Sequence, residues 1–377
     1  MKRKPYLTRG GARMEENSCG FKYVEGPVIV YKGFDKDFCC HGKQYEVGKS
    51  YHTDGDMKYL SEVFYGFIQA IQAILIYKSD KSARFAVVEL SGTVLKRDDD
   101  FYEATDMKIL REIDLLSFMK RVRYSLKSRK KEIITRSTYS FVPDCMLRDD
   151  VILPLFANDK KIYMNGRNSM LATMGGGCEV LFDNGSAVSC MGVSQKITSV
   201  AIEAKIMNSG ECCFIESYGE RAQICNMGDF GKMFIAGNDT CLLNNGHSCS
   251  IISTGKDINI SDCGFDTFIA SSGENASITA SGDNAHILST GDNANIAVTG
   301  NDAFVNCFGK NTVISIIGKR CVVTAKDWKN VTFVGVRADL AQLSAKGYNS
   351  VTSFNPNTSG SEEWRFMNDG KIEENKE

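Results

Sequence analysis

The chain has 377 residues, of which 43% are hydrophobic and 14 are cysteine, and its formal net charge is −1. This apolar content excludes a disordered chain, and the length allows two or three compact units with cores of their own. The cysteines are too widely spread for a small disulfide-stapled scaffold, and the near-zero charge argues against a general binder of nucleic acids or membrane surfaces.

The chain opens with a basic arm, predicted over residues 1–25, whose first 13 residues carry five basic side chains and no acid. No apolar stretch follows these charges, so we expect no secretory signal. The longest apolar run, 64–77, has 14 residues including Gln69 and Gln72, too few to cross a bilayer. We therefore expect an intracellular protein with reduced cysteines.

Residues 26–105 are predicted to form a small α+β domain. Short runs of strand-forming residues closed by glycine indicate strands over 28–31, 44–47 and 84–90. Apolar residues at roughly helical spacing indicate a helix over 61–77.

Three segments of this domain carry a resemblance. They read Tyr-Lys-Gly-Phe over 31–34, Cys-His-Gly-Lys-Gln-Tyr-Glu-Val-Gly-Lys-Ser-Tyr over 40–51 and Val-Glu-Leu-Ser-Gly over 88–92. They resemble a family of uncharacterised phage and prophage proteins, whose members often continue into Gly-Asp-Asn-Ala-x-Ile arrays and a short C-terminal cap. The resemblance implies a phage or prophage origin and the host cytoplasm, but no established activity. This chain departs from the family at 63–67, where members usually carry Gly-Phe-His-Ala-Cys.

The same domain admits a weak catalytic hypothesis. A strand, a Tyr-x-Gly turn, a helix and a strand ending in Glu resemble ADP-ribosyl-transfer folds, in which Tyr31 would flank nicotinamide and Glu89 would orient a ribose hydroxyl. The matching His and a Ser-Thr-Ser segment are missing, and fold analogy alone is a weak basis for function. We therefore favour a strand-edge aromatic and a solvated glutamate, and expect no catalytic residue and no cofactor.

Residues 106–150 are predicted to be an amphipathic helical linker, with a long helix over 106–129. Its end is strongly basic, with no acid between the first and last of seven cations: Lys120, Arg121, Arg123, Lys127, Arg129, Lys130 and Lys131. A solvated helix end explains such a run. The functional alternative is contact with RNA, DNA or an acidic protein surface.

A nine-residue repeat is the strongest signal in the chain. Glycine recurs at every ninth position from Gly210 to Gly318, and an apolar residue stands five positions after each glycine. Three positions after the glycine lies a small side chain, which shares one strand face with that apolar residue. Because Gly and Asn tolerate positive φ, Gly-Asp-Asn predicts a turn.

One turn and one short strand per repeat predict a right-handed parallel β-helix over 151–325 with two repeats per coil. The regular repeats give about seven coils, or roughly 35 Å at the usual strand spacing. Cys213, Cys249 and Cys321 occupy the small inward position, where a thiol acts as a small hydrophobe. Scattered histidines and the absence of Gly-Gly-x-Gly-x-Asp argue against a metal.

The repeat region also carries an acidic stretch. Residues 257–302 hold seven acids and no Lys or Arg, and five of these acids are candidate binding residues: Asp266, Glu274, Asp283, Asp292 and Asp302. We expect Glu274 and Asp292 on one edge and Asp283 on the other. Solvated turns explain the acids; the alternative is an acidic ladder that imitates nucleic-acid phosphates.

The period stops after Val323, and residues 326–377 are predicted to be a cap and tail. The fold class is therefore mainly β, a nonapeptide solenoid behind a small α+β domain. We expect a non-enzymatic phage-encoded protein that inhibits a host nucleic-acid-handling defence complex, of the anti-CRISPR or anti-restriction type. The alternatives are a virion fibre protein and an ADP-ribosyltransferase-like domain.

Overall fold

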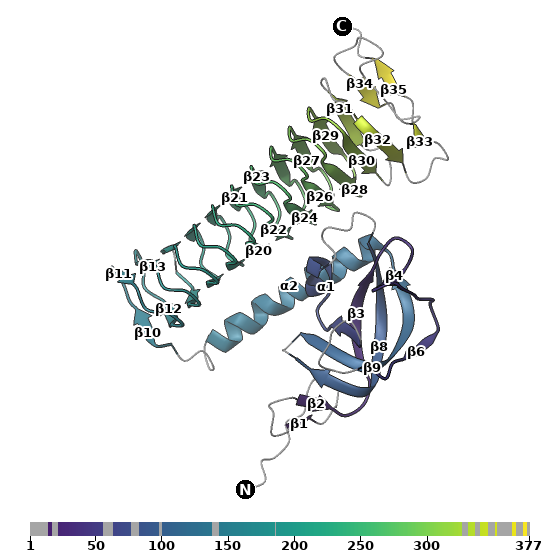
Figure 1. The fold of residues 1–377 in the computed structure, drawn as a ribbon. Coiled ribbons are helices and arrows are strands. Elements are labelled where there is room, and N and C mark those ends of the chain that lie inside the picture. Colours follow the sequence, from purple (N-terminus) through teal and green to yellow (C-terminus); the bar gives the residue numbers. More distant parts are fainter. Residues whose placement is uncertain are drawn as a thin grey trace. The chain divides into compact units, whose positions relative to one another are not determined.

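The fold is taken from a computed structural model of the whole chain. The structure describes residues 14–16, 22–55, 63–76, 83–97, 100–137, 143–184, 186–325, 331–335, 340–345, 351–352, 364–366 and 372–374, with side chains over 22–55, 63–76, 83–97, 100–133, 143–184 and 186–325. The chain divides into two units, Met1–Ser125 and Leu126–Glu377. Both are drawn in Figure 1.

The N-terminal unit is a small α+β domain. Its elements are β1 (Met14–Glu16), β2 (Lys22–Val24), β3 (Val28–Phe34), β4 (Cys39–Cys40), β5 (Lys43–Gln44), β6 (Ser50–His52), β7 (Phe64–Phe67), α1 (Ala70–Ile76), β8 (Arg84–Lys96) and β9 (Phe101–Ile113). Within the described residues, seven strands form one sheet in the order β1-β2-β8-β3-β7-β9-β6. An additional β8–β9 pairing closes β8, β3, β7 and β9 into a ring, which encloses an aromatic core.

The helices predicted over 61–77 and 106–129 are only partly correct. Residues 64–67 form strand β7, and only Ala70–Ile76 is helical. Residues 101–113 form strand β9, where buried Met107 and Ile109 alternate with exposed Lys108 and Leu110. Alternate residues of a strand lie on the same face of a sheet, so Met107 and Ile109 share the buried face. Pairing of this segment with β8 therefore outweighs the helical pattern that its apolar residues also fit.

Helix α2 (Leu115–Ser137) therefore starts later than predicted, and Asp114 caps it by accepting a hydrogen bond of 2.9 Å from the amide of Ser117. The helix contributes Leu115–Ser125 to the first unit and its remainder to the second. The separate linker predicted over 106–150 is thus wrong, since its first part is a sheet strand and its last part belongs to the solenoid.

The second unit is a parallel β-solenoid. Its first sheet contains β10 (Cys145–Leu147), β12 (Lys161–Met164), β14 (Glu179–Phe182), β16 (Lys196–Ser199), β18 (Phe214–Ser217), β20 (Lys232–Ile235), β22 (Ser250–Ser253), β24 (Phe268–Ser271), β26 (His286–Ser289), β28 (Phe304–Cys307), β30 (Cys321–Ala325), β32 (Leu340–Ala345) and β33 (Val351–Thr352). Its second sheet contains β11 (Ile152–Leu155), β13 (Met170–Thr173), β15 (Ala187–Cys190), β17 (Lys205–Asn208), β19 (Gln223–Asn226), β21 (Cys241–Asn244), β23 (Asn259–Asp262), β25 (Ser277–Ala280), β27 (Asn295–Val298), β29 (Thr312–Ile316), β31 (Val331–Gly335), β34 (Trp364–Phe366) and β35 (Ile372–Glu374).

The predicted solenoid is confirmed, but it is longer than predicted. Over the described part of 145–325 it makes about ten turns, roughly 48 Å at the strand spacing, instead of seven. The additional turns start at Cys145 and include 151–191, which lie within the predicted solenoid but before the strict nine-residue glycine spacing from which the seven coils were counted. Three of the strand pairings here, β10–β12, β13–β15 and β14–β16, have a 17-residue register, as in Glu179↔Lys196, and this shift hides these turns from a strict nine-residue search.

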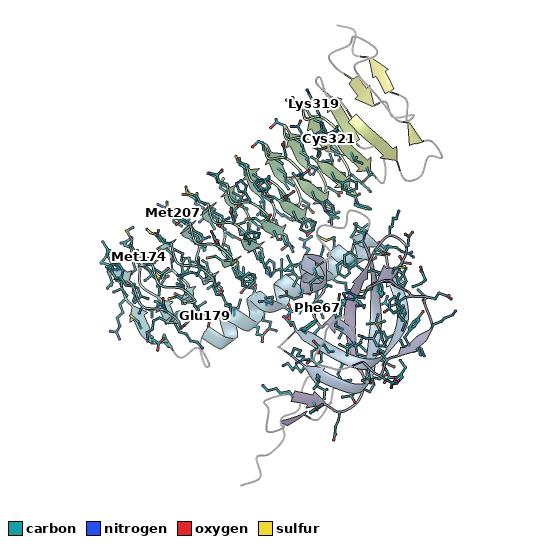
Figure 2. All side chains as sticks on the ribbon, in the orientation of Figure 1. Phe67, Met174, Glu179, Met207, Lys319 and Cys321 are labelled. Atoms are coloured by element: carbon teal, nitrogen blue, oxygen red, sulfur yellow. The ribbon has the colours of Figure 1, made fainter. Side chains whose placement is uncertain are left out.

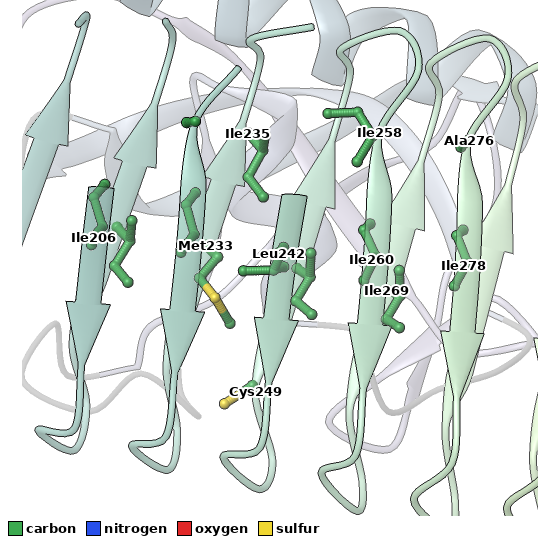
Figure 3. Packing of buried hydrophobic residues seen from close by; sticks show 14 of the residues in the cluster. Ile206, Met233, Ile235, Leu242, Cys249, Ile258, Ile260, Ile269, Ala276 and Ile278 are labelled. Atoms are coloured by element: carbon green, nitrogen blue, oxygen red, sulfur yellow. The ribbon is translucent and has the colours of Figure 1, made fainter. Parts of the chain in front are cut away.

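Apolar residues of successive turns stack inside the solenoid. Ile251, Ile269 and Ile287 are consecutive register partners in the first sheet, and each is fully buried. Figure 3 shows the equivalent stack in both sheets, with Cys249 at the small inward position. The cysteines for which side chains are described are all free thiols, and Cys213, Cys249 and Cys321 lie inside as predicted.

The repeat glycines are required for close approach, not for positive φ. The left-handed residue is the third of the repeat, such as Asn275, Asn284 or Asn293, each with φ of 58°. A Cβ on the glycines at every ninth position from Gly210 to Gly318 would lie 1.6–2.1 Å from a backbone carbonyl oxygen of the turn below. The predicted turn is therefore correct, whereas the role assigned to glycine in it is wrong.

A ladder of buried amides runs beside the apolar stack in the second sheet. Asn208 donates to Asn226, Asn226 to Asn244, and Asn244 to Asp262, with distances of 2.7, 2.7 and 2.6 Å. Each asparagine also donates to the carbonyl of the glycine two residues on. The ladder ends in a carboxyl group whose Oδ2 has no hydrogen-bond partner among the described residues, and burial raises the pKa of Asp262 to about 6.

Beyond 325 the two sheets continue as β31 and β32, and antiparallel strands β33, β34 and β35 follow. Antiparallel pairing ends the parallel stack, as the predicted cap requires. Within the predicted cap, the apolar residues that would cover the last turn include Trp328 and Val336, which lie outside the described residues, as do the side chains of Phe333, Leu340, Leu343, Trp364 and Phe366. Most of the basic arm, 1–13 and 17–21, also lies outside them.

Replacing a repeat glycine with alanine should destabilise the stacked turns of the solenoid. In Gly291→Ala the new Cβ would sit 1.7 Å from the carbonyl oxygen of Gly273, so we expect a loss of about 2–4 kcal/mol. Gly176→Ala is the matched control, because its Cβ meets nothing closer than 3.4 Å. Hydrogen exchange of the flanking strands measures both variants; equal protection in the two would refute the close-approach explanation.

Asp262→Asn should stabilise the solenoid in a pH-dependent way. Because the pKa of Asp262 is raised from 3.8 to about 6, its ionisation costs stability progressively as pH rises from 4 to 6. The variant should be more stable by about 2–3 kcal/mol at pH 7.5 and no different near pH 4. Urea unfolding at both pH values measures this, with exposed Asp283→Asn as control; a gain independent of pH would contradict it.

Candidate functional site

The five candidate acids lie on two opposite edges of the solenoid. Successive turns are related by 18 residues, so Glu274 and Asp292 share one edge, and Asp266, Asp283 and Asp302 follow the other. The division of Glu274, Asp283 and Asp292 between two edges was predicted from the repeat. The five acids therefore do not form one continuous ladder.

Most of these acids have partners in the neighbouring turn. Asp283 accepts a hydrogen bond from the backbone amide of Asn301 at 2.7 Å, and Asp292 accepts one from that of Lys310 at 2.8 Å. Glu274 is paired with Lys256, and Asp302 with Arg320. Turn stabilisation explains these positions without a binding partner, although the carboxylates remain exposed enough to contact one.

The basic run on α2 does not act as one patch. Arg129 donates to buried Glu216 at 2.9 Å, and Lys130 donates to the carbonyl oxygen of Tyr218 at 2.8 Å. These two cations hold the end of α2 on the solenoid, so both have a structural role, and their assignment as binding residues stays a prediction. The exposed members of the run are Lys120, Arg121, Lys127 and Lys131, and Arg123 is half-buried.

Tyr31 and Glu89 lie on one face of the β3–β8 pair, where Tyr31 is opposite Val87 and Glu89 is opposite Ile29. The Tyr31 ring makes an edge contact with Phe118, at a centroid distance of 6.0 Å. Packing against α2 therefore gives Tyr31 a structural role, and the catalytic assignment of Tyr31 and Glu89 stays a hypothesis.

The outer face of the second solenoid sheet has a composition that sequence analysis missed. Over β13–β29 every outward side chain is exposed or half-buried, and Lys205 is the one charged residue among these described positions. Met207 and Leu243 are exposed there by 54% and 39%, and Figure 2 shows Met207 on the outside. We call these outward positions of β13–β29 the uncharged face. Comparing alternate repeats separately would have revealed it.

A small cavity in the N-terminal unit is the second feature that sequence analysis missed. It measures about 250 Å³ and is lined by Lys32, Cys40, His41, Lys43, Tyr45, Thr53, Gly55, Val63 and Phe64. We call it the Lys32 cavity. Its lining comes largely from the Tyr-Lys-Gly-Phe and Cys-His-Gly-Lys-Gln-Tyr segments that carry the family resemblance, and those segments were the signal that could have located it.

Lys32 is the unusual residue of this cavity. It is 2% exposed, and its Nζ lies 3.5 Å from the centroid of the Tyr65 ring. Burial lowers the pKa of Lys32 to about 8. Burial, and then the charge of Lys32, lower the pKa of His41. A buried amine with this perturbation in a cavity is a recognised mark of functional sites.

The described residues contain no group of three or more His, Cys, Asp or Glu side chains placed to hold a metal ion. In the same part of the chain, no helix is both long and apolar enough to span a membrane.

Comparison with known protein families gives a match in the N-terminal unit. Residues 28–121 match the model of a domain of unknown function, DUF7666, which covers the sheet ring, the Lys32 cavity and the start of α2. No curated protein and no solved structure matches the chain.

Replacing Lys32 should stabilise the N-terminal unit at neutral pH. With a pKa of about 8 in the fold and 10.5 outside it, the buried ammonium costs stability below pH 8, and this cost disappears as pH rises towards 10.5. Lys32→Met should therefore raise stability by about 1–3 kcal/mol at pH 7 and by much less at pH 10. Calorimetry at both pH values tests this, with exposed Lys36→Met as control; destabilisation at pH 7 would contradict it.

Proposed function

We propose that the protein is a non-enzymatic binding protein that presents the uncharged face of its solenoid, flanked by the acid-bearing edges, to a protein partner. The uncharged face carries this proposal. Nine stacked strands display a nearly charge-free surface, whereas ordinary protein surface intersperses charges of both signs. Depletion of charge is typical of the centre of protein interfaces.

The dimensions of the face indicate how the edges take part. Nine strands of four residues cover roughly 500 Å² at the usual strand spacing and rise. A specific interface buries about 800 Å² on each partner. A partner seated on the face would therefore reach the edges, where Asp266, Asp283 and Asp302 lie on one side and Glu274 and Asp292 on the other.

The finer proposal is that the chain is phage-encoded and acts in the host cytoplasm on a nucleic-acid-handling defence complex. The family resemblance supports the origin, and the exposed edge acids support a partner with a basic surface. The exposed cations Lys120, Arg121 and Lys127 offer a smaller nucleic-acid contact than the sequence suggested.

Affinity capture from host lysate, with and without nuclease, should yield a stoichiometric complex. The double variant Met207→Lys with Leu243→Lys should lower its recovery at least tenfold, because it places two charges at the centre of the face. Lys205→Met is the matched control and should retain the complex.

The contribution of the acid-bearing edges to partner binding can be tested separately from that of the uncharged face. Glu274→Gln, Asp283→Asn and Asp292→Asn together remove charge but keep the oxygen acceptors of the turns, so the fold is preserved and the association rate should fall. Unchanged recovery in the Met207/Leu243 variant would overturn the proposal. Finding the protein in purified virions without a captured complex would favour a structural role instead.

A further inference from the structure

The Lys32 cavity is bordered by basic side chains. These are Lys32, Lys43 and His41, and no Asp or Glu is among the described lining residues. Its walls also include the ring of Phe64 and the buried ring of Tyr45. Lys43 lies over the rings of Tyr51 and Phe64 at 5.3 and 5.2 Å, which holds its ammonium close to the cavity.

The Lys32 ammonium is buried against aromatic faces. Its neighbours are the ring of Tyr65, the ring of Phe34 at 5.7 Å and the side chain of Cys40, with which it forms a hydrogen bond. These neighbours compensate the buried cation only in part, because burial still lowers the pKa of Lys32 to about 8. An anion entering the cavity would supply the remaining compensation.

We propose that the Lys32 cavity binds a small oxyanion, the carboxylate or phosphate group of a small molecule whose apolar part rests on Tyr45 and Phe64. Lys32 provides the buried charge, Lys43 provides a second positive charge at the mouth, and His41 offers a ring N–H that can donate a hydrogen bond. The volume of about 250 Å³ accommodates such a group and a ring, and it is too small for a folded partner. This site is separate from the solenoid, so it does not depend on the partner proposed above.

Binding should be linked to proton uptake. The titratable groups around Lys32 are Cys40, His41, Lys43, Tyr45 and Tyr65. Near pH 8 about half of the Lys32 amines are neutral, and a bound anion favours the charged form. Occupancy should therefore draw in about half a proton per site at pH 8.

Isothermal titration calorimetry of the full chain tests this with two probes, inorganic phosphate and benzoate, in 150 mM NaCl. Titrations at pH 8 in two buffers of different ionisation enthalpy report the proton uptake. We expect saturable binding of at least one probe, and the one that binds more tightly distinguishes a phosphate from a carboxylate ligand. Lys32→Met should weaken binding at least tenfold and abolish the uptake, and Lys43→Met should weaken it less.

Lys36→Met removes an exposed lysine outside the cavity and serves as the control for general attraction of anions. Its affinity should equal that of the unaltered chain. Failure of both probes to bind, or equal binding by Lys32→Met and Lys36→Met, would overturn the proposal. Calorimetric melting of each variant confirms that loss of binding is not loss of the fold.

Discussion

The stacking of one solenoid turn on the next is the constraint on which the second unit depends. Parallel pairing fixes the distance between turns at the strand spacing, about 4.8 Å. At that distance a Cβ added to any of the glycines at every ninth position from Gly210 to Gly318 would collide with a carbonyl oxygen of the turn below, so no side chain fits at these corners. The same spacing stacks isoleucine on isoleucine in the core and amide on amide in the buried ladder. A substitution in one turn therefore affects mainly the packing of the two neighbouring turns.

This regularity also determines what the surface charges do. Asp283 and Asp292, each at the residue after a repeat glycine, accept hydrogen bonds from backbone amides of the next turn, whereas Glu274 at the same position pairs with Lys256. Arg129 and Lys130 likewise hold helix α2 on the first sheet. Charges that look like binding residues in sequence thus stabilise turns and a helix end. The uncharged face of the second sheet differs from these positions, because no stabilising contact has been assigned to its outward side chains.

The N-terminal unit follows a different logic. Its ring of strands builds an aromatic core from residues distant in sequence, and a lysine is buried in that core. Lysine is rarely buried without a counter-charge, because desolvation of the ammonium costs more than a ring contact returns. A fold selected for stability alone would place an apolar residue there. The cost of Lys32 is understandable if the cavity beside it is occupied by an anion.

The sequence by itself determined the solenoid, its two repeats per turn, its inward residues and the division of the acids between two edges. These features are local and periodic, so each repeat predicts the next. Only the tertiary structure decided the strand Phe101–Ile113, because pairing with β8 outweighs a pattern that also fits a helix. It alone brought Lys32, Cys40 and Tyr45 around one cavity, and it alone showed that Arg129 is neutralised by Glu216, 87 residues away. Such contacts join chain segments that have no common sequence repeat. Their interaction energies can be judged only when the burial of the groups and the distance between them are known.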